Sequence, residues 1–183
     1  MVLLKALIGF ISRINDGLLA LGRQIAWICI ALMVATILLQ VFMRYVLNAA
    51  LPWPEEAARA LMLWMTGFVA PSAFRWGGFV AIDTIREAIR GLPGRILSFV
   101  ILAIAMIVLL TMLRYGIKHV QSGTLFRAGS MPIKLAWIYA SLPVGVGLML
   151  LVGIELLLKQ IHQFADPSVE YAADKASVGF SAE

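Results

Sequence analysis

The sequence predicts an all-α membrane protein with four transmembrane helices, an amphipathic interfacial helix at the N-terminus and a second one in a loop. Of the 183 residues, 62% are apolar and 14% are charged, and the mean hydropathy is +0.93. Soluble domains have about 45–50% apolar and about 25% charged residues. A chain this apolar could not cover its folded surface with polar groups, so a lipid bilayer is its expected solvent.

The composition also excludes several kinds of chemistry. A single cysteine, Cys29, rules out an internal disulfide, a CxxC redox pair and a thiolate zinc cluster. The two histidines, His119 and His162, follow different predicted spans and so fall on opposite membrane faces, which disfavours a bis-histidine haem site. The net charge of +5 comes without a basic stripe interleaved with aromatic residues, so nucleic-acid binding is not expected.

Three spans follow from long uncharged windows. Residues 24–43, 96–113 and 135–154 contain no charged side chain, and twenty helical residues cover about 30 Å, one hydrocarbon thickness. We therefore expect transmembrane helices over about 24–44, 95–115 and 135–158. No ionisable group falls in the middle of any predicted span, which argues against an enzyme or a pump.

The remaining span, over about 55–78, is less apolar. Arg59 and Arg75 enclose only fifteen uncharged residues, which is about 22 Å of helix. An earlier start at Pro54 lengthens the helix and places Glu55 and Glu56 in its first turn, where the helix dipole favours carboxylates. Three spans with a re-entrant segment is the alternative.

Two segments have the pattern of helices that lie in the headgroup plane. In residues 1–22, apolar side chains recur at helical spacing opposite Ser12 and Asp16. A second such helix is expected over about 80–91, with isoleucines on one face, and residues 166–183 form a polar, flexible cytoplasmic tail. Counted over the alternating loops, nine Lys and Arg lie on the side of both termini and six on the other, so both termini are predicted to be cytoplasmic.

The densest group of unusual residues lies at the turn between the first two spans, and we name it the outer cluster. Its aromatic residues suit the membrane–water interface, and Arg44 is expected to face two acidic residues across the turn. It is interpreted as a stapled helical hairpin, as a partner-docking surface, or as both. Its members are Arg44, Tyr45, Asn48, Trp53, Glu55, Glu56 and Arg59.

The motifs of this region resemble the small membrane subunit of tripartite ATP-independent periplasmic (TRAP) transporters. The resemblance covers about residues 20–160 and has the family's order: an aromatic-x-Arg-Tyr run, an Asn, then Trp-x-Glu-Glu opening the second span. Later matches include Arg75-Trp76-Gly77-Gly78, Ile82-Asp83, Leu92-Pro93, Met131-Pro132 and Leu142-Pro143-Val144-Gly145. Asp83 stands at its family position, whereas Phe79 replaces a histidine that the family often has, so no role of that histidine is carried over.

The resemblance implies a non-enzymatic subunit of the bacterial inner membrane, without a cofactor of its own. Its partners would be membrane lipids, a large membrane subunit that carries the sodium and substrate sites, and a periplasmic substrate-binding protein. The small subunit would scaffold the large, elevator-type one for uptake of an organic acid such as a dicarboxylate or sialic acid. The alternative is a four-helix anchor subunit of another complex, such as a respiratory enzyme; a third reading is a self-sufficient small exporter.

Overall fold

The computed structural model describes residues 2–89 and 92–165, and the predicted tail, 166–183, lies outside them. The described part is helical, with one isolated bridge between Arg127 and Lys134. Its elements are α1 (Val2–Tyr45), α2 (Trp53–Ala88), α3 (Leu92–Gly123), the short α4 (Leu135–Tyr139) and α5 (Ser141–Ala165).

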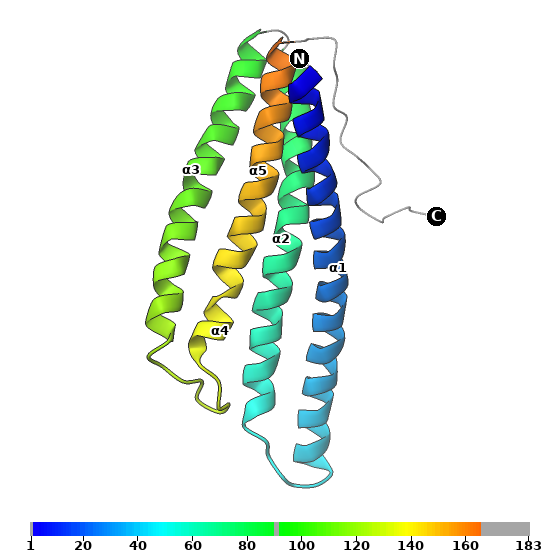
Figure 1. Ribbon diagram of the computed structural model, residues 1–183. Coiled ribbons are helices and arrows are strands. Elements are labelled where there is room, and N and C mark those ends of the chain that lie inside the picture. Colours follow the sequence, from blue (N-terminus) through cyan, green and yellow to red (C-terminus); the bar gives the residue numbers. More distant parts are fainter. Residues whose placement is uncertain (1, 90–91, 166–183) are drawn as a thin grey trace, which may run out of the picture.

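The four long helices alternate in direction and form a bundle with α1 and α3 at its edges (Figure 1). The helix α5 packs against both α2 and α3, and α2 packs along α1. At the upper end in Figure 1, here called the terminal end, α1 and α3 begin and α2 and α5 end. The lower end, here called the hairpin end, holds the α1–α2 turn and α4.

Two pairs of segments that the sequence predicts to be separate helices are continuous in the structure. The predicted interfacial helix 1–22 continues without a break into the predicted span 24–44 in α1, and the predicted span 55–78 continues in α2 as far as Ala88. Residues 90–91 of the predicted helix 80–91 lie outside the described residues. The glycines at 77–78 lower helix propensity, but they do not remove a backbone donor as proline would. A helix that continues keeps its backbone groups paired, which matters most in an apolar solvent.

Within residues 2–89 and 92–165, three helices are long and apolar enough to cross a membrane: Lys5–Tyr45, Leu92–Gly123 and Leu135–Gln163. The helix α2 does not reach this threshold, although at 36 residues it would extend about 54 Å. That α2 forms a fourth span therefore stays a prediction.

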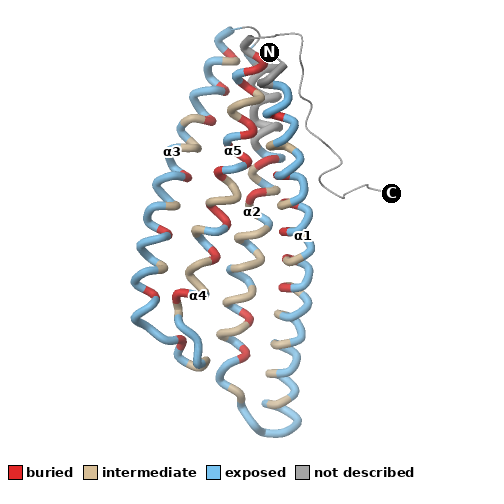
Figure 2. The backbone as a smooth tube through the Cα atoms, in the orientation of Figure 1, coloured by how far each residue is buried: buried red, intermediate tan, exposed pale blue. Residues whose placement is uncertain are grey.

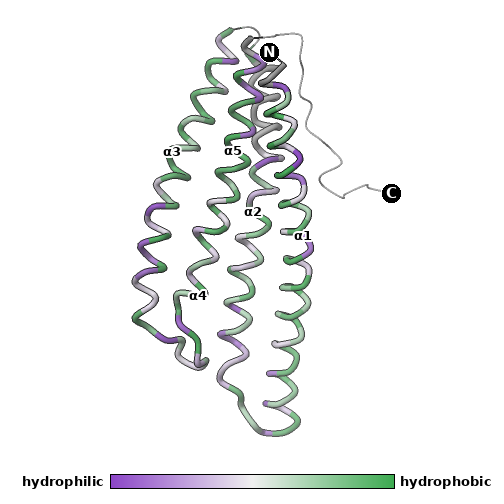
Figure 3. The backbone as a smooth tube through the Cα atoms, viewed as in Figure 1, coloured by the Kyte–Doolittle hydropathy of each residue, from purple (hydrophilic) through white to green (hydrophobic). Residues whose placement is uncertain are grey.

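The bundle is packed around α5 and is exposed at its edges. In the most apolar 18-residue window of each candidate span, the share of buried residues is 44% for Leu135–Gln163, which comprises α4 and most of α5. The share is 11% for the window in α1 and 22% for the window in α3. Exposed residues run along α1 and α3 in Figure 2, and Figure 3 shows that much of this exposed surface is hydrophobic. Contiguous exposed apolar surface of this extent is typical of contact with lipid or with another apolar protein.

The helices α2 and α5 make a close backbone-to-backbone contact through two glycines. A Cβ added to Gly145 would lie 2.8 Å from the Cα and the carbonyl oxygen of Gly67, and one added to Gly67 would lie 2.8 Å from the carbonyl oxygen of Ser141. Small residues at these positions let the two backbones meet directly. This contact holds α2 against the central helix near the middle of the bundle.

Candidate functional site

The most unusual feature of the structure is a buried group of charged and polar side chains near the terminal end, here called the inner network. It consists of Ser12, Asn15 and Asp16 from α1, Arg75 from α2, and Glu155 and Lys159 from α5. Residues from three helices therefore meet at one place, and the hydrogen-bonded partners Asn15 and Glu155 lie 140 positions apart in the sequence.

Arg75 is the centre of the inner network. Its guanidinium donates to Glu155 Oε1 at 2.7 Å and to Ser12 Oγ at 3.1 Å, and it forms a further ion pair with Asp16. Only 7% of the Arg75 side chain is exposed, so one buried cation links α2 to both α1 and α5.

Glu155 is the fully buried anion of the network, with 0% of its side chain exposed. Asn15 Nδ2 donates to its Oε2 at 2.7 Å, and Lys159, one turn further along α5, donates to its Oε1. A buried carboxylate is costly unless it is paired and hydrogen-bonded, and here it accepts bonds from three different side chains. Asp16 completes the group from a half-exposed position.

The face that α1 turns towards its neighbours differs from the apolar face expected from the sequence. Of the apolar face expected from helical spacing, Ile8 is buried but Leu7 and Ile14 are exposed. Asn15 and Leu19, which were not expected on that face, are buried beside Ile8. The partly polar face packs inwards because Arg75 and Glu155 supply partners for its side chains.

The hairpin end is held together by a second, smaller contact, here called the outer latch. The carboxylate of Glu56, in the first turn of α2, accepts hydrogen bonds from the backbone N–H groups of Gly129 and Ser130 at 3.0 and 2.8 Å and from the Ser130 hydroxyl. These two residues lie in the connection between α3 and α4. Glu56 therefore links the α1–α2 hairpin to the α3–α4 connection at the same end of the bundle.

The other residues of the outer cluster make local contacts. Glu55 pairs with Arg59 at 3.1 Å on the exposed helix surface. Arg44 lies 5.8 Å from the ring centroid of its neighbour Tyr45, and no ion pair joins Arg44 to Glu55 or Glu56, all of which the structure describes. The expected pairing of Arg44 across the turn is therefore wrong.

The turn itself depends on the backbone of Asn48. Its φ of 47° is in the left-handed region, which asparagine tolerates better than most residues. The N–H of the following Ala49 donates to the Met43 carbonyl at 2.9 Å and closes the end of α1. After this turn, α2 begins at Trp53, which is partly exposed. Asp83, the last predicted site residue, lies in α2, but its side chain is outside the described residues.

The structure thus joins the predicted Glu56 to an unexpected loop and adds the whole inner network. In the sequence, Arg75 ends an uncharged run, and Glu155 follows the uncharged run 135–154 and lies four residues before Lys159, the spacing of a local pair within one helix. The distance along the helix could have linked Arg75 to Glu155. Each residue lies about 30 Å of helix from the hairpin end of its own span, so the two fall at the same depth in the bundle. In the part of the chain described, no group of three His, Cys, Asp or Glu side chains could hold a metal ion.

A comparison with known protein families identifies the chain. The model for "Tripartite ATP-independent periplasmic transporters, DctQ component" matches residues 33–163, which is more than two thirds of the sequence. A search among curated proteins gave no match. The family match includes α2, α3, α4 and α5 up to the inner-network residues Glu155 and Lys159. The chain therefore belongs to the DctQ family, the small membrane subunit of TRAP transporters.

Proposed function

We propose that this chain is a non-catalytic scaffold for the large membrane subunit of its transporter, against which that subunit moves during transport. The observation that carries the proposal is that the bundle is tied at both ends while its edge helices stay exposed. The inner network joins α1, α2 and α5, and the outer latch joins the start of α2 to the α3–α4 connection. A scaffold needs such rigidity because a moving subunit can only work against a body that does not deform with it.

The exposed edges offer the surface on which a large apolar partner could pack. Large hydrophobic side chains are exposed along the membrane-length parts of α1 and α3, among them Trp27, Leu38, Ile104 and Ile107. Helices of a large subunit can pack on such a surface without first removing charges from water. We expect at least one of the two edges to be covered in the assembled transporter and the other to face lipid.

The remaining parts of the proposal rest on the family. We propose that the transporter takes up an organic acid, couples uptake to sodium in the large subunit and receives substrate from a periplasmic binding protein. The three apolar helices and the family point to an inner-membrane protein. We propose in addition that both termini are cytoplasmic, so that the hairpin end, with the outer cluster, faces the periplasm and the binding protein.

The orientation can be measured with single cysteines. In a Cys29→Ser background, a cysteine at Tyr45, which is 74% exposed, should react with a membrane-impermeant maleimide added outside spheroplasts. A cysteine at Phe10, which is 65% exposed at the other end of α1, should react only after the cells are opened. The reverse pattern would refute the proposed topology.

The scaffold role is tested by affinity purification of the tagged chain from its native membrane in mild detergent, with mass spectrometry of the proteins that accompany it. A large polytopic subunit should co-purify, and uptake by proteoliposomes should require both chains. Glu55→Ala together with Glu56→Ala should reduce complex yield or binding-protein docking, and Glu55→Ala alone should not. Co-purification of redox subunits with a haem absorbance spectrum would contradict the proposal.

A further inference from the structure

The exposed face of α3 near the hairpin end carries two cations that the bundle itself does not neutralise. Arg114 and Lys118 lie one helical turn apart on this face, and both are exposed. None of the ion pairs among the described residues involves either of them. Two like charges at this spacing repel each other, so the face is suited to an external anion.

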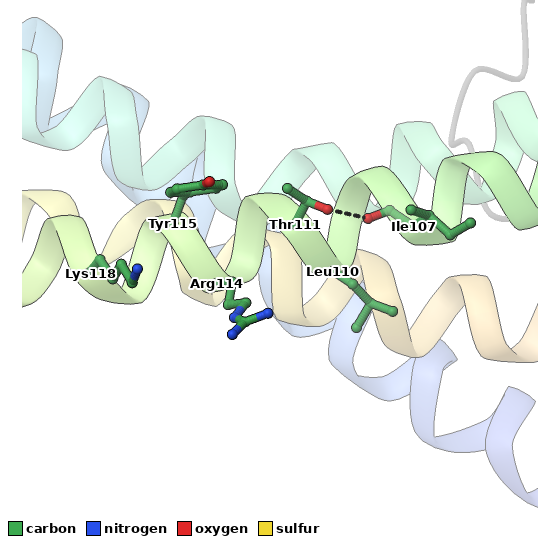
Figure 4. Close-up of a pocket in the computed structure, with 6 residues that line it drawn as sticks. All are labelled: Ile107, Leu110, Thr111, Arg114, Tyr115 and Lys118. Atoms are coloured by element: carbon green, nitrogen blue, oxygen red, sulfur yellow. Dashed lines mark hydrogen bonds between the residues drawn. The ribbon is translucent and has the colours of Figure 1, made fainter.

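The side chains around the two cations form a hollow rather than a flat surface. Ile107, Leu110, Thr111, Arg114, Tyr115 and Lys118 line a space of about 440 Å³ (Figure 4). In Figure 4, Arg114 and Leu110 extend towards one side of α3, while Tyr115 and Thr111 extend towards the other. The ammonium of Lys118 lies 5.8 Å from the centroid of the Tyr115 ring, which keeps this cation close to the hollow.

A second hollow, of about 500 Å³, adjoins the first on the side that faces α5. The two share Thr111, Tyr115 and Lys118, and the second adds Met112 and Leu142 as apolar walls. These three shared residues form a ridge between the two hollows, and Lys118 borders both of them. The ridge therefore carries a cation and separates two mainly apolar hollows.

We propose that this ridge binds an anionic phospholipid, with its phosphate between Arg114 and Lys118 and its two acyl chains in the two hollows. Arg114 directly follows the uncharged run 96–113, so it lies where an apolar helix reaches the headgroup level. An arginine and a tyrosine at that level commonly hold a polar headgroup while their neighbours contact the acyl chains. An acidic protein segment would match the cations but not the apolar hollows that continue from them.

Binding can be measured by native mass spectrometry of the full chain, purified in mild detergent with the proteins that accompany it, during titration with phosphatidylglycerol. Arg114→Gln with Lys118→Gln should weaken phosphatidylglycerol binding roughly 30-fold, and Lys118→Gln alone roughly fivefold. The charge-preserving pair Arg114→Lys with Lys118→Arg should keep most of the affinity. Because all of these side chains are exposed, the fold should persist, which the labelling rate of the buried Cys29 can verify.

The matched control is Arg44→Gln with Arg127→Gln, which removes the same charge from the end of α1 and from the α3–α4 connection, at the same end of the bundle. Retained affinity in this control supports a site, whereas an equal loss would mean that binding follows net charge, and the proposal would be wrong. Equal binding of zwitterionic phosphatidylcholine would also overturn it. A third outcome would overturn it as well: the Arg114→Gln, Lys118→Gln variant loses the large subunit but still binds lipid. The face would then be a protein interface.

Discussion

The Arg75–Glu155 pair should behave as a unit whose halves cannot be removed separately. With Arg75→Met, the fully buried Glu155 loses its guanidinium partner; with Glu155→Met, Arg75 loses the buried carboxylate that lies 2.7 Å away. Lys159 still pairs with Glu155 in the first variant, and Asp16 still pairs with Arg75 in the second, so the charge left behind is only partly compensated. Breaking a buried ion pair by removing one member costs about 3–5 kcal/mol. We expect each single substitution to lower the free energy of unfolding by that amount.

The double variant Arg75→Met, Glu155→Met should recover most of this loss. Replacing both members of a buried pair by apolar side chains of similar size is often neutral or stabilising. The coupling energy between the two sites should therefore be about 3 kcal/mol or more, since the loss in either single variant comes from the charge left behind. The control is Asp16→Asn: 55% of that side chain is exposed, so its ion pair with Arg75 should contribute only about 0–1 kcal/mol.

The chain carries its own reporter for this measurement. Cys29 is its only cysteine and is buried in α1, so a dye that fluoresces on reaction with thiols reports the unfolding of the bundle during heating. The single variants should unfold well below the unaltered protein, and the double variant and Asp16→Asn close to it. If the two single losses simply added in the double variant, or if Asp16→Asn were as damaging as Glu155→Met, the inner network would not be the buried, coupled unit described above.

Three other predictions concern the outer latch, the helix crossing and the tail. Glu56→Gln should lower the unfolding temperature in the thiol-dye assay and speed hydrogen exchange in the α3–α4 connection, because the hydrogen bonds to a charged acceptor are weakened; Glu55→Gln, which alters only an exposed pair, should leave both nearly unchanged. Gly145→Ala should cost about 1–3 kcal/mol because its Cβ meets the α2 backbone, whereas Gly147→Ala, with open space around it, should be neutral or slightly stabilising, and equal effects would refute the close crossing. Truncation after Phe164 should leave uptake by proteoliposomes unchanged, and lost transport would show that the tail is needed.

The sequence was informative wherever a feature is local. Uncharged windows located α1, α3 and α5, and the proline and acidic residues at 54–56 indicated the start of α2. Ser141 and Gly145, two small residues four positions apart, have the spacing typical of close helix contacts, and both lie at the crossing with α2. Ala31 and Ala35 have the same spacing but both are exposed, because spacing alone does not say which face of a helix meets a neighbour.

The inner network was missed because each member has an adequate local explanation. Arg75 could extend to the headgroup level, Glu155 could pair within its own helix, and Asn15 looked like part of a surface helix. Only the tertiary arrangement shows that the three side chains satisfy one another. The amphipathic pattern was misleading for a related reason: hydrophobicity alone selects the apolar face for burial, but a polar face can pack inside when its partners are already there.

The same network explains why α2 can be the least apolar of the long helices and still lie within the bundle. Its charge at Arg75 would oppose insertion of an isolated helix, since an unpaired arginine at membrane depth is costly. Once α1 and α5 provide Asp16 and Glu155, the charge is compensated, and α2 is held from both sides. The position of α2 therefore depends on helices that flank it in space but are distant in sequence, so the bundle should form as one cooperative unit. Such cooperativity is what a scaffold requires, because a helix that could leave its place independently would give a moving partner no fixed surface.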